Sequence, residues 1–181
     1  MTVEEYLALE RGSEEKSEYL QGETFAMTGA SIKHNLITGN IFAELKRQLR
    51  QTDCHAFVSD MRVGVPAEEL YTYPDVVVVC GEPKLEDEYL DTLLNPVLII
   101  EVLSKSTASY DRVTKFRYYR TIESLAEYLL VAQNQQRVEQ YTKQPDGRWL
   151  LTDISSPESV VELASVGCGL RLKDIYERVE F

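Results

Sequence analysis

Apolar side chains recur every four residues over one stretch in the first third of the chain. The stretch covers residues 32–51, and Ser31 precedes it as a suitable N-cap. The stripe consists of Ile37, Ile41, Leu45 and Leu49. This spacing predicts a long amphipathic helix. A capping-box pattern at Thr2 and Glu5 predicts a short helix before it, and residues 18–27 predict a small hairpin.

Short runs of β-branched and other apolar residues replace the helical spacing from residue 55 onward. The predicted strands are residues 55–58, 61–65, 76–79, 97–103, 128–132, 137–142 and 149–154. The runs at 76–79 and 97–103 are almost purely apolar, as in strands that are covered on both faces. A helix predicted over residues 108–122 joins the strands 97–103 and 128–132, and a right-handed crossover of this kind places them parallel. The chain is therefore predicted to be a mixed α/β protein.

Length and composition fit an ordinary globular protein. The 181 residues predict one domain over residues 1–181, with 44% hydrophobic and 27% charged residues. No apolar stretch reaches the ~18 residues of a membrane span. The first twenty residues carry acids where a signal peptide would be basic and then apolar, so a cytoplasmic protein is expected. The three cysteines, Cys54, Cys80 and Cys168, lack metal or redox spacing and are predicted to be reduced core residues.

The charge distribution leaves room for a polyanionic partner despite a net charge of −11. Residues 101–120 carry five bases against two acids, and residues 33–50 are also locally basic. The five bases are Lys105, Arg112, Lys115, Arg117 and Arg120. With only two histidines and no zinc-type motif, a metal held by this chain would be a hard ion bound by carboxylates.

Two acidic residues stand where burial makes an ionised side chain costly. Glu101 interrupts the apolar run 97–103, and an unpaired carboxylate there would be expensive unless it binds a metal or a cation. The alternative is that Glu101 reaches solvent at the strand end or pairs with an arginine. Asp75 precedes the valine run 76–79, although Pro74-Asp75 alone also favours a turn. Two carboxylates at the ends of adjacent central strands would suit Mg²⁺.

Lys115 is the third candidate. Asp111 and Lys115 share one face of the predicted helix, and this helix begins only a few residues after Glu101. The alternative is an exposed ion pair with Asp111, which would contribute only a few tenths of a kcal/mol.

These residues and several others together resemble a known bacterial family. The matching segments are Gly22-Glu23, His34-Asn35, Ser59-Asp60-Met61-Arg62, Pro74-Asp75, Glu101-Val102-Leu103-Ser104, Ser106-Thr107, Asp111, Lys115, Tyr118-Tyr119, Glu127-Tyr128 and Asp174-Ile175-Tyr176. The chain resembles the restriction-endonuclease-like family of unknown function within the PD-(D/E)XK nuclease superfamily. The resemblance implies a central mixed β-sheet flanked by helices, here with an added N-terminal hairpin and C-terminal strands.

The resemblance also implies a site and an activity. Asp75 and Glu101 correspond to the two acids of the motif and would bind Mg²⁺ or Mn²⁺. The usual lysine stands two residues after the second acid, where this chain has Leu103, and Lys115 is its expected replacement. The implied function is divalent-metal-dependent phosphodiester hydrolysis of DNA, with Asp75, Glu101 and Lys115 as catalytic residues. Hydrolysis of another phosphoester is a weaker hypothesis, and a non-catalytic module that binds nucleic acid or protein is the main alternative.

Other residues have simpler structural interpretations. His34 lies on the apolar stripe and is predicted to be a core histidine, with a role in the site as the alternative. Ser104, Ser106 and Thr107 are expected to cap a helix, although they could also contact phosphate. The aromatic residues, Tyr118 and Tyr119 among them, are expected to pack in the core. The late strands with exposed Tyr141 and Trp149 suggest a homodimer.

Overall fold

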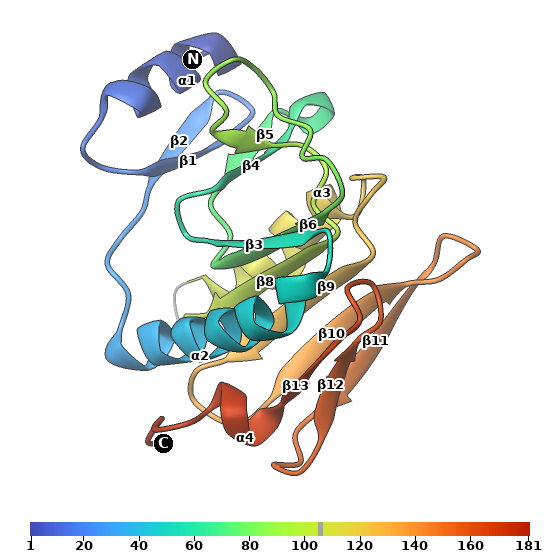
Figure 1. Ribbon diagram of the computed structural model, residues 1–181. Helices are drawn as coiled ribbons and strands as arrows, with labels where there is room; N and C mark the ends of the chain where they lie inside the picture. Colours follow the sequence, from blue (N-terminus) through green and yellow to red (C-terminus); the bar gives the residue numbers. More distant parts are fainter. Residues whose placement is uncertain (105–106) are drawn as a thin grey trace.

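A six-stranded sheet forms the centre of the protein (Figure 1), in a computed structural model that describes residues 1–104 and 107–181. Its strand order is β11-β10-β9-β8-β6-β3. The strands are β3 (Cys54–Val58), β6 (Val76–Cys80), β8 (Leu98–Leu103), β9 (Glu127–Ala132), β10 (Val138–Lys143) and β11 (Trp149–Ile154). Strands β8 and β9 are parallel and the other neighbours are antiparallel. The predicted parallel crossover and the mixed sheet are confirmed.

A second sheet of five strands follows the order β2-β1-β5-β4-β7. Its strands are β1 (Ser17–Leu20), β2 (Glu23–Ala26), β4 (Arg62–Val65), β5 (Leu70–Thr72) and β7 (Thr92–Leu93). Near the C-terminus, β12 (Val160–Leu163) pairs with β13 (Cys168–Arg171). The predicted hairpin is confirmed as β1 and β2. Strands β5, β7, β12 and β13 were not predicted, because they are too short to show a clear alternation of polarity.

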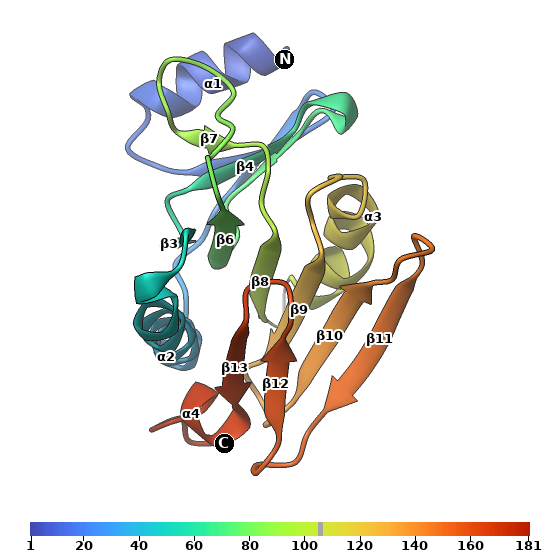
Figure 2. The same cartoon turned by 45° about the vertical axis from the view of Figure 1, so that its right-hand side comes forward.

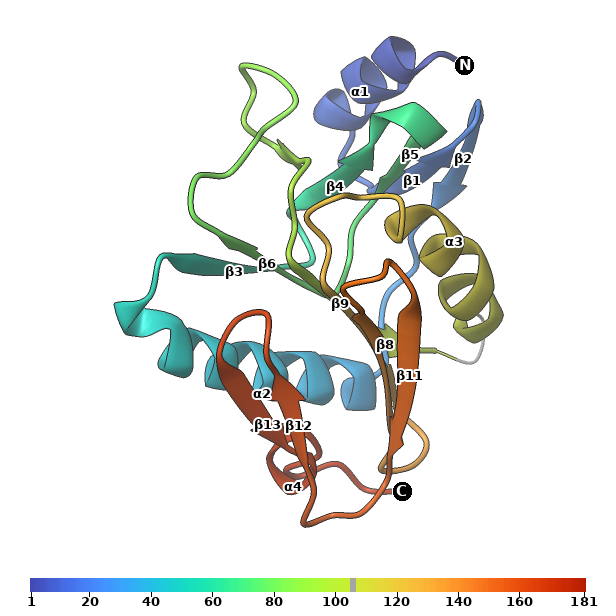
Figure 3. The ribbon, with the colours of Figure 1, turned by 90° about the vertical axis from the view of Figure 1, so that its right-hand side faces the viewer.

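Helices cover both faces of the six-stranded sheet (Figures 2 and 3). The helices are α1 (Val3–Gly12), α2 (Ile32–Gln48), α3 (Phe116–Tyr119) and α4 (Leu172–Ile175), and a π-helical turn, Tyr110–Lys115, leads directly into α3. The predicted caps Thr2 and Ser31 accept hydrogen bonds from the backbone of Glu5 and His34. No helix in the described part of the chain is long and apolar enough to cross a membrane.

The two faces of the central sheet bury separate apolar clusters. Ile100 and Val102 of β8 pack with residues of α2, β12, β13 and α4. Ile99 and Leu103 of the same strand pack on the opposite face with residues of β4 and with Tyr119 of α3. Since side chains alternate along a strand, Glu101 lies on the face of Ile99 and Leu103. This face is enclosed between the five-stranded sheet and α3.

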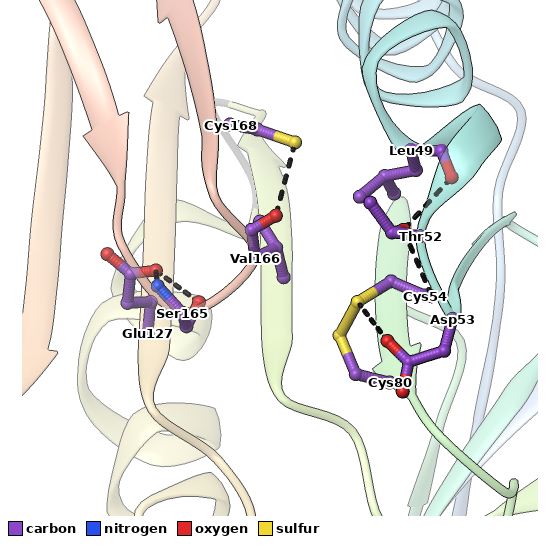
Figure 4. Close-up of a disulfide and its surroundings, with 9 residues drawn as sticks. All are labelled: Leu49, Thr52, Asp53, Cys54, Cys80, Glu127, Ser165, Val166 and Cys168. Carbon is purple, nitrogen blue, oxygen red and sulfur yellow. Dashed lines mark hydrogen bonds between the residues drawn. A yellow bond between two sulfur atoms is a disulfide. The ribbon is translucent and has the colours of Figure 1, made fainter.

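A disulfide bond joins β3 to β6 (Figure 4). Cys54 and Cys80 lie directly opposite each other in the antiparallel pairing and are covalently linked, whereas Cys168 is a buried free thiol. The prediction that all three cysteines are reduced is therefore wrong. A separation of 26 residues along the chain concealed a pair that the strand register brings together. Closing a loop of this length stabilises the fold by about 3 kcal/mol through loss of unfolded-state entropy.

The aromatic residues expected on the surface are partly buried instead. The rings of Tyr141 and Trp149 have their centroids 4.3 Å and 5.4 Å from that of Phe116. They therefore complete an aromatic cluster beside α3 and do not form an exposed contact surface. Exposed aromatic side chains therefore no longer support a homodimer, which stays a prediction.

Ion pairs attach α1 to the loop that follows β6. Arg11 lies 2.7 Å from Asp87 and 2.8 Å from Asp91, and the buried Arg62 lies 2.9 Å from the same Asp91 oxygen. Hydrogen bonds from Arg11, with the charge of Arg62, hold the pKa of the Asp91 carboxyl far below its usual 3.8. Asp91 thus anchors the N-terminal helix and the second sheet at one point.

Replacing this carboxylate should make stability depend on pH in one direction. A group whose folded pKa is depressed contributes stability above its unfolded pKa and loses it as the pH falls. We expect Asp91→Asn to lower the melting temperature at neutral pH, and the difference from wild type to shrink as the pH falls below 3.8. Thermal melts of wild type, Asp91→Asn and the exposed control Glu88→Gln test this. A difference that stayed constant over the acid range would contradict it.

Candidate active site

A buried ion pair joins the central sheet to the helical segment after it. Glu101 of β8 and Lys115 at the end of the π-helical turn are 4% and 5% exposed, and Lys115 Nζ lies 3.2 Å from Glu101 Oε1. The Tyr119 hydroxyl also donates to Glu101 Oε1, over 3.2 Å, and is hydrogen-bonded in turn to Thr72 of β5. The expectations that Glu101 reaches solvent or pairs with an arginine do not hold. Glu101 is a buried carboxylate with a lysine partner.

Three carboxylates surround the Lys115 ammonium. Besides Glu101, Nζ lies 2.8 Å from Glu18 Oε1 and 3.4 Å from Asp111 Oδ1. The Lys115 and Asp111 side chains are 6% and 4% exposed, so the alternative of an exposed ion pair is wrong. Burial alone would lower the pKa of the Lys115 ammonium, but the carboxylates, with Glu101 first among them, raise it well above its usual value. The carboxylates therefore favour the charged form of Lys115.

Glu18 is the member of this cluster that sequence reasoning did not single out. It lies on β1, where Leu20 shares its face of the strand and packs into the cluster beneath α3. Glu18 also accepts a hydrogen bond from the backbone amide of Tyr73, over 3.3 Å. The only available signal was an acidic residue on the inward face of a short strand, which is weak in isolation.

The backbone around the helical segment places Asp111 and Lys115 in this interior. Ser104 and Thr107 exchange hydrogen bonds, with the Thr107 amide donating to Ser104 Oγ over 3.0 Å, in agreement with their expected capping role. Lys105 and Ser106 lie outside the described residues. Further on, the Tyr128 hydroxyl donates to the Asp111 carbonyl over 3.0 Å. A π-helical turn of this kind is rare and is frequently found at functional sites.

Asp75 lies next to Glu101 through the pairing of β6 with β8. Val76 is opposite Ile100, so one further step in this antiparallel register brings Asp75 opposite Glu101. The Val102 amide donates to Asp75 Oδ2 over 2.7 Å, which fixes the carboxylate at the strand end. Asp75 remains 17% exposed at its side chain.

His34 contacts Asp75 from the first turn of α2. Its Nε2 lies 3.2 Å from Asp75 Oδ2, and hydrogen bonding and charge from Asp75 raise the pKa of the imidazole, although burial alone would lower it. The interpretation of His34 as a core histidine is wrong, and the alternative, a histidine that faces the site, describes its position. His34 lies one turn before Ile37 and beside the Asp75 carboxylate, so the apolar stripe of α2 begins only after it.

Asp75, Glu101 and Lys115 line one cleft of about 900 Å³. The acidic residues in its lining are Glu15, Glu18, Asp75, Glu101 and Asp111. Against these stand Lys16, Lys115 and His34. The cleft is therefore rich in negative charge, and any phosphate that enters it requires an additional cation.

The basic segment 101–120 does not line this cleft as a continuous basic surface. Lys115 is enclosed by carboxylates, and Arg112 forms an ion pair with Glu139. Among the described bases of the segment, only Arg117 and Arg120 are exposed, and neither lines the cleft. The described bases of this segment therefore give little support to the polyanionic partner for which the charge distribution left room.

The donor set fits a hard divalent cation. The acidic side chains in the lining of the cleft are all carboxylates. Burial raises the pKa of Glu101 well above its usual value, and the charges of Asp111, Asp75 and Glu18 add to this, whereas the charge of Lys115 opposes it. Within residues 1–104 and 107–181, no three potential donors of the cleft lie within 4.8 Å of one another. Asp53, Cys54 and Cys80 satisfy that distance, but the two cysteines are bonded to each other. Asp75 and Glu101 thus match Mg²⁺, which takes one or two protein carboxylates and completes its shell with water.

Removal of the central cation should destabilise the fold. Lys115→Met would leave three carboxylates in the interior without their counter-charge, and breaking a buried pair in this way costs about 3 kcal/mol. Urea unfolding of wild type, Lys115→Met and the exposed control Arg117→Met measures this cost. A loss below ~0.5 kcal/mol, typical of a surface ion pair, would contradict the burial of the cluster.

Comparison with known proteins agrees with this architecture. Two uncharacterized proteins of Synechocystis sp. (strain ATCC 27184) are similar: sll1609 is 43% identical over 91% of this chain and 93% of its own, and slr1290 is 34% identical over 100% and 94%. A crystal structure titled as a "putative nuclease belonging to DUF820" from Anabaena variabilis has the same fold, with a TM-score of 0.79, 21% identity and 97% of both chains covered. The model of the Uma2 family, described as "Putative restriction endonuclease", matches residues 3–173. This chain therefore belongs to the Uma2 family, as the resemblance of its motifs indicated.

Proposed function

We propose that this protein hydrolyses phosphodiester bonds of DNA with the help of a divalent metal ion, Mg²⁺ or Mn²⁺. One observation supports the proposal above all others. The ammonium of Lys115 lies 3.2 Å from the buried carboxylate of Glu101, in a cleft that Asp75 also lines. The description of the family and of its solved relative as nuclease-like agrees with this chemistry.

Asp75 and Glu101 are the proposed metal ligands. Asp75 stands just before β6 and Glu101 lies within the neighbouring strand β8, and their carboxylate oxygens are the donors that Mg²⁺ and Mn²⁺ prefer. A divalent ion bound there would supply positive charge to the phosphate and lower the pKa of a water molecule. The Val102 amide and His34 orient Asp75, so its carboxylate is held in place before any ligand arrives.

Lys115 is the proposed catalytic cation. Its raised pKa keeps it protonated, so it donates hydrogen bonds and charge and does not act as a base. Its role is to stabilise the negative charge that develops on the phosphate oxygens. The position that usually carries this lysine is Leu103, which packs in the apolar cluster on the same face as Glu101. The π-helical turn brings Lys115 to that face by another route.

Glu18 and Asp111 would act as positioning residues in this proposal. Each contacts Lys115 Nζ from a different element, β1 and the π-helical turn. Together with Glu101 they hold the ammonium in one place, which favours pre-organised electrostatic catalysis. The same acids repel a bare phosphate, which would make activity strictly dependent on a divalent ion.

A DNA cleavage assay with Mn²⁺ tests the proposal. Wild type should cleave, while Glu101→Gln and Lys115→Ala should each lose about 10²–10³-fold in turnover, because each removes one electrostatic contact. The exposed control Glu158→Gln should cleave like wild type, and melts must show that each variant is folded. Undiminished cleavage by folded Glu101→Gln would contradict the proposal. A wild type that cleaves no DNA would favour the alternative, a non-catalytic module that binds nucleic acid or protein.

A further inference from the structure

Exposed apolar side chains form one wall of the cleft. Phe25 of β2 is 45% exposed and Met27, just after this strand, is 38% exposed, and both line the cleft. Strand β2 is the outer strand of the five-stranded sheet, and all four of its residues are exposed. Large apolar side chains left open beside a charged site indicate a contact with a ligand.

An aromatic residue faces Phe25 from the other wall. The ring of Tyr110, in the π-helical turn, has its centroid 6.4 Å from that of Phe25. Lys115 Nζ lies 5.6 Å from the centre of the same Tyr110 ring. The two rings are therefore neighbours in the lining of the cleft, and Tyr110 lies next to the charge cluster of Lys115.

The described cationic groups of the cleft already form ion pairs within the protein. Lys16 lies 2.6 Å from Asp60 and donates to the Ser59 carbonyl, and Lys115 is enclosed by three carboxylates. Proteins that bind duplex DNA rely on many contacts between Lys or Arg and the phosphates. Only two lysines, Lys16 and Lys115, are among the described residues that line this cleft, so the metal ion and the bases would supply most of the affinity.

We propose that the cleft accepts an unpaired nucleotide, with its base against Phe25 and Tyr110 and its phosphate toward Asp75, Glu101 and Lys115. The substrate class would then be single-stranded DNA or a locally unpaired segment of a duplex. This inference rests on the proposed nuclease function. Within a double helix the faces of a base are covered by its neighbours, so an aromatic side chain can stack on a base only after the base has left the stack. Aromatic platforms beside a strand are how proteins bind unpaired DNA without reading its sequence.

Fluorescence anisotropy with labelled oligonucleotides tests the stacking. Ca²⁺ replaces Mg²⁺ as the oxygen-bound cation, and gels confirm that the DNA stays intact. Wild type should bind a single strand about tenfold or more tightly than the matching duplex, and Phe25→Ala should lose about tenfold on the single strand only. An abasic strand should bind equally to wild type and Phe25→Ala, because no base is present to stack. Leu150→Ala, an exposed apolar change on β11, is the control.

A second variant guards against a folding defect. Phe25→Trp should retain affinity, and its added indole emission should be quenched by the single strand and not by the duplex. Equal binding of single strand by wild type and Phe25→Ala, duplex binding as tight as single-strand binding, or no binding of any oligonucleotide would each overturn the inference.

Cleavage with Mn²⁺ separates this inference from the function on which it rests. Glu101-dependent cleavage of duplex DNA, with no preference for unpaired strands, would leave the nuclease proposal in place and overturn the stacking. Binding of single strands that depends on Phe25, with no cleavage of any DNA, would support the stacking and contradict the hydrolysis. Strand β2 is the outer strand of its sheet and could instead bind a peptide by strand pairing. In that case Phe25→Ala would leave DNA binding unchanged, and this result would overturn the inference.

Discussion

The ammonium of Lys115, enclosed by the carboxylates of Glu18, Glu101 and Asp111, is the interaction on which the candidate site depends. Several carboxylates cannot share a dry interior unless a cation compensates them, and a buried lysine without them would lose its proton. The cluster therefore ties together β1, β8 and the π-helical turn, which belong to different layers of the fold. A displacement of any one of them would leave a buried charge without its partner.

The charges of this cluster reduce the stability of the fold at the residues that the proposed chemistry needs. Burial and the neighbouring acids raise the pKa of Glu101, which means that its ionised form is strained in the protein as it stands. A divalent cation beside Asp75 and Glu101 would relieve that excess of negative charge. The apolar packing of Val77, Ile99 and Tyr119 around the cluster supplies the stability that the charges do not.

Much of this arrangement is visible in the sequence because it follows from local patterns. The stripe of α2 and the apolar runs of β6 and β8 predict the central layers, the caps at Thr2 and Ser31 predict the starts of α1 and α2, and Glu101 is conspicuous because it breaks an apolar strand. Lys115 was found through its resemblance to a family motif and its nearness to Glu101 along the chain.

What the sequence did not show depends on contacts between distant segments. Glu18 reaches Lys115 only because two sheets pack face to face, and Cys54 reaches Cys80 only through a strand register. The sequence places His34 in the core because its position continues an apolar stripe. In the structure, His34 lies in the first turn of α2 and contacts Asp75 instead. The basic segment 101–120 looked continuous in sequence, but its side chains point to different partners in the fold.

The central claim is that the Asp75 and Glu101 carboxylates form a site for a divalent ion. Isothermal titration calorimetry of the full chain with Mn²⁺ tests it most directly, with Asp75→Asn as the variant and the exposed Asp174→Asn as the control. The account predicts that wild type and Asp174→Asn bind the ion alike, and that Asp75→Asn binds it at least tenfold more weakly, about 1.4 kcal/mol. Equal binding by Asp75→Asn, or no binding by the wild type, would contradict it.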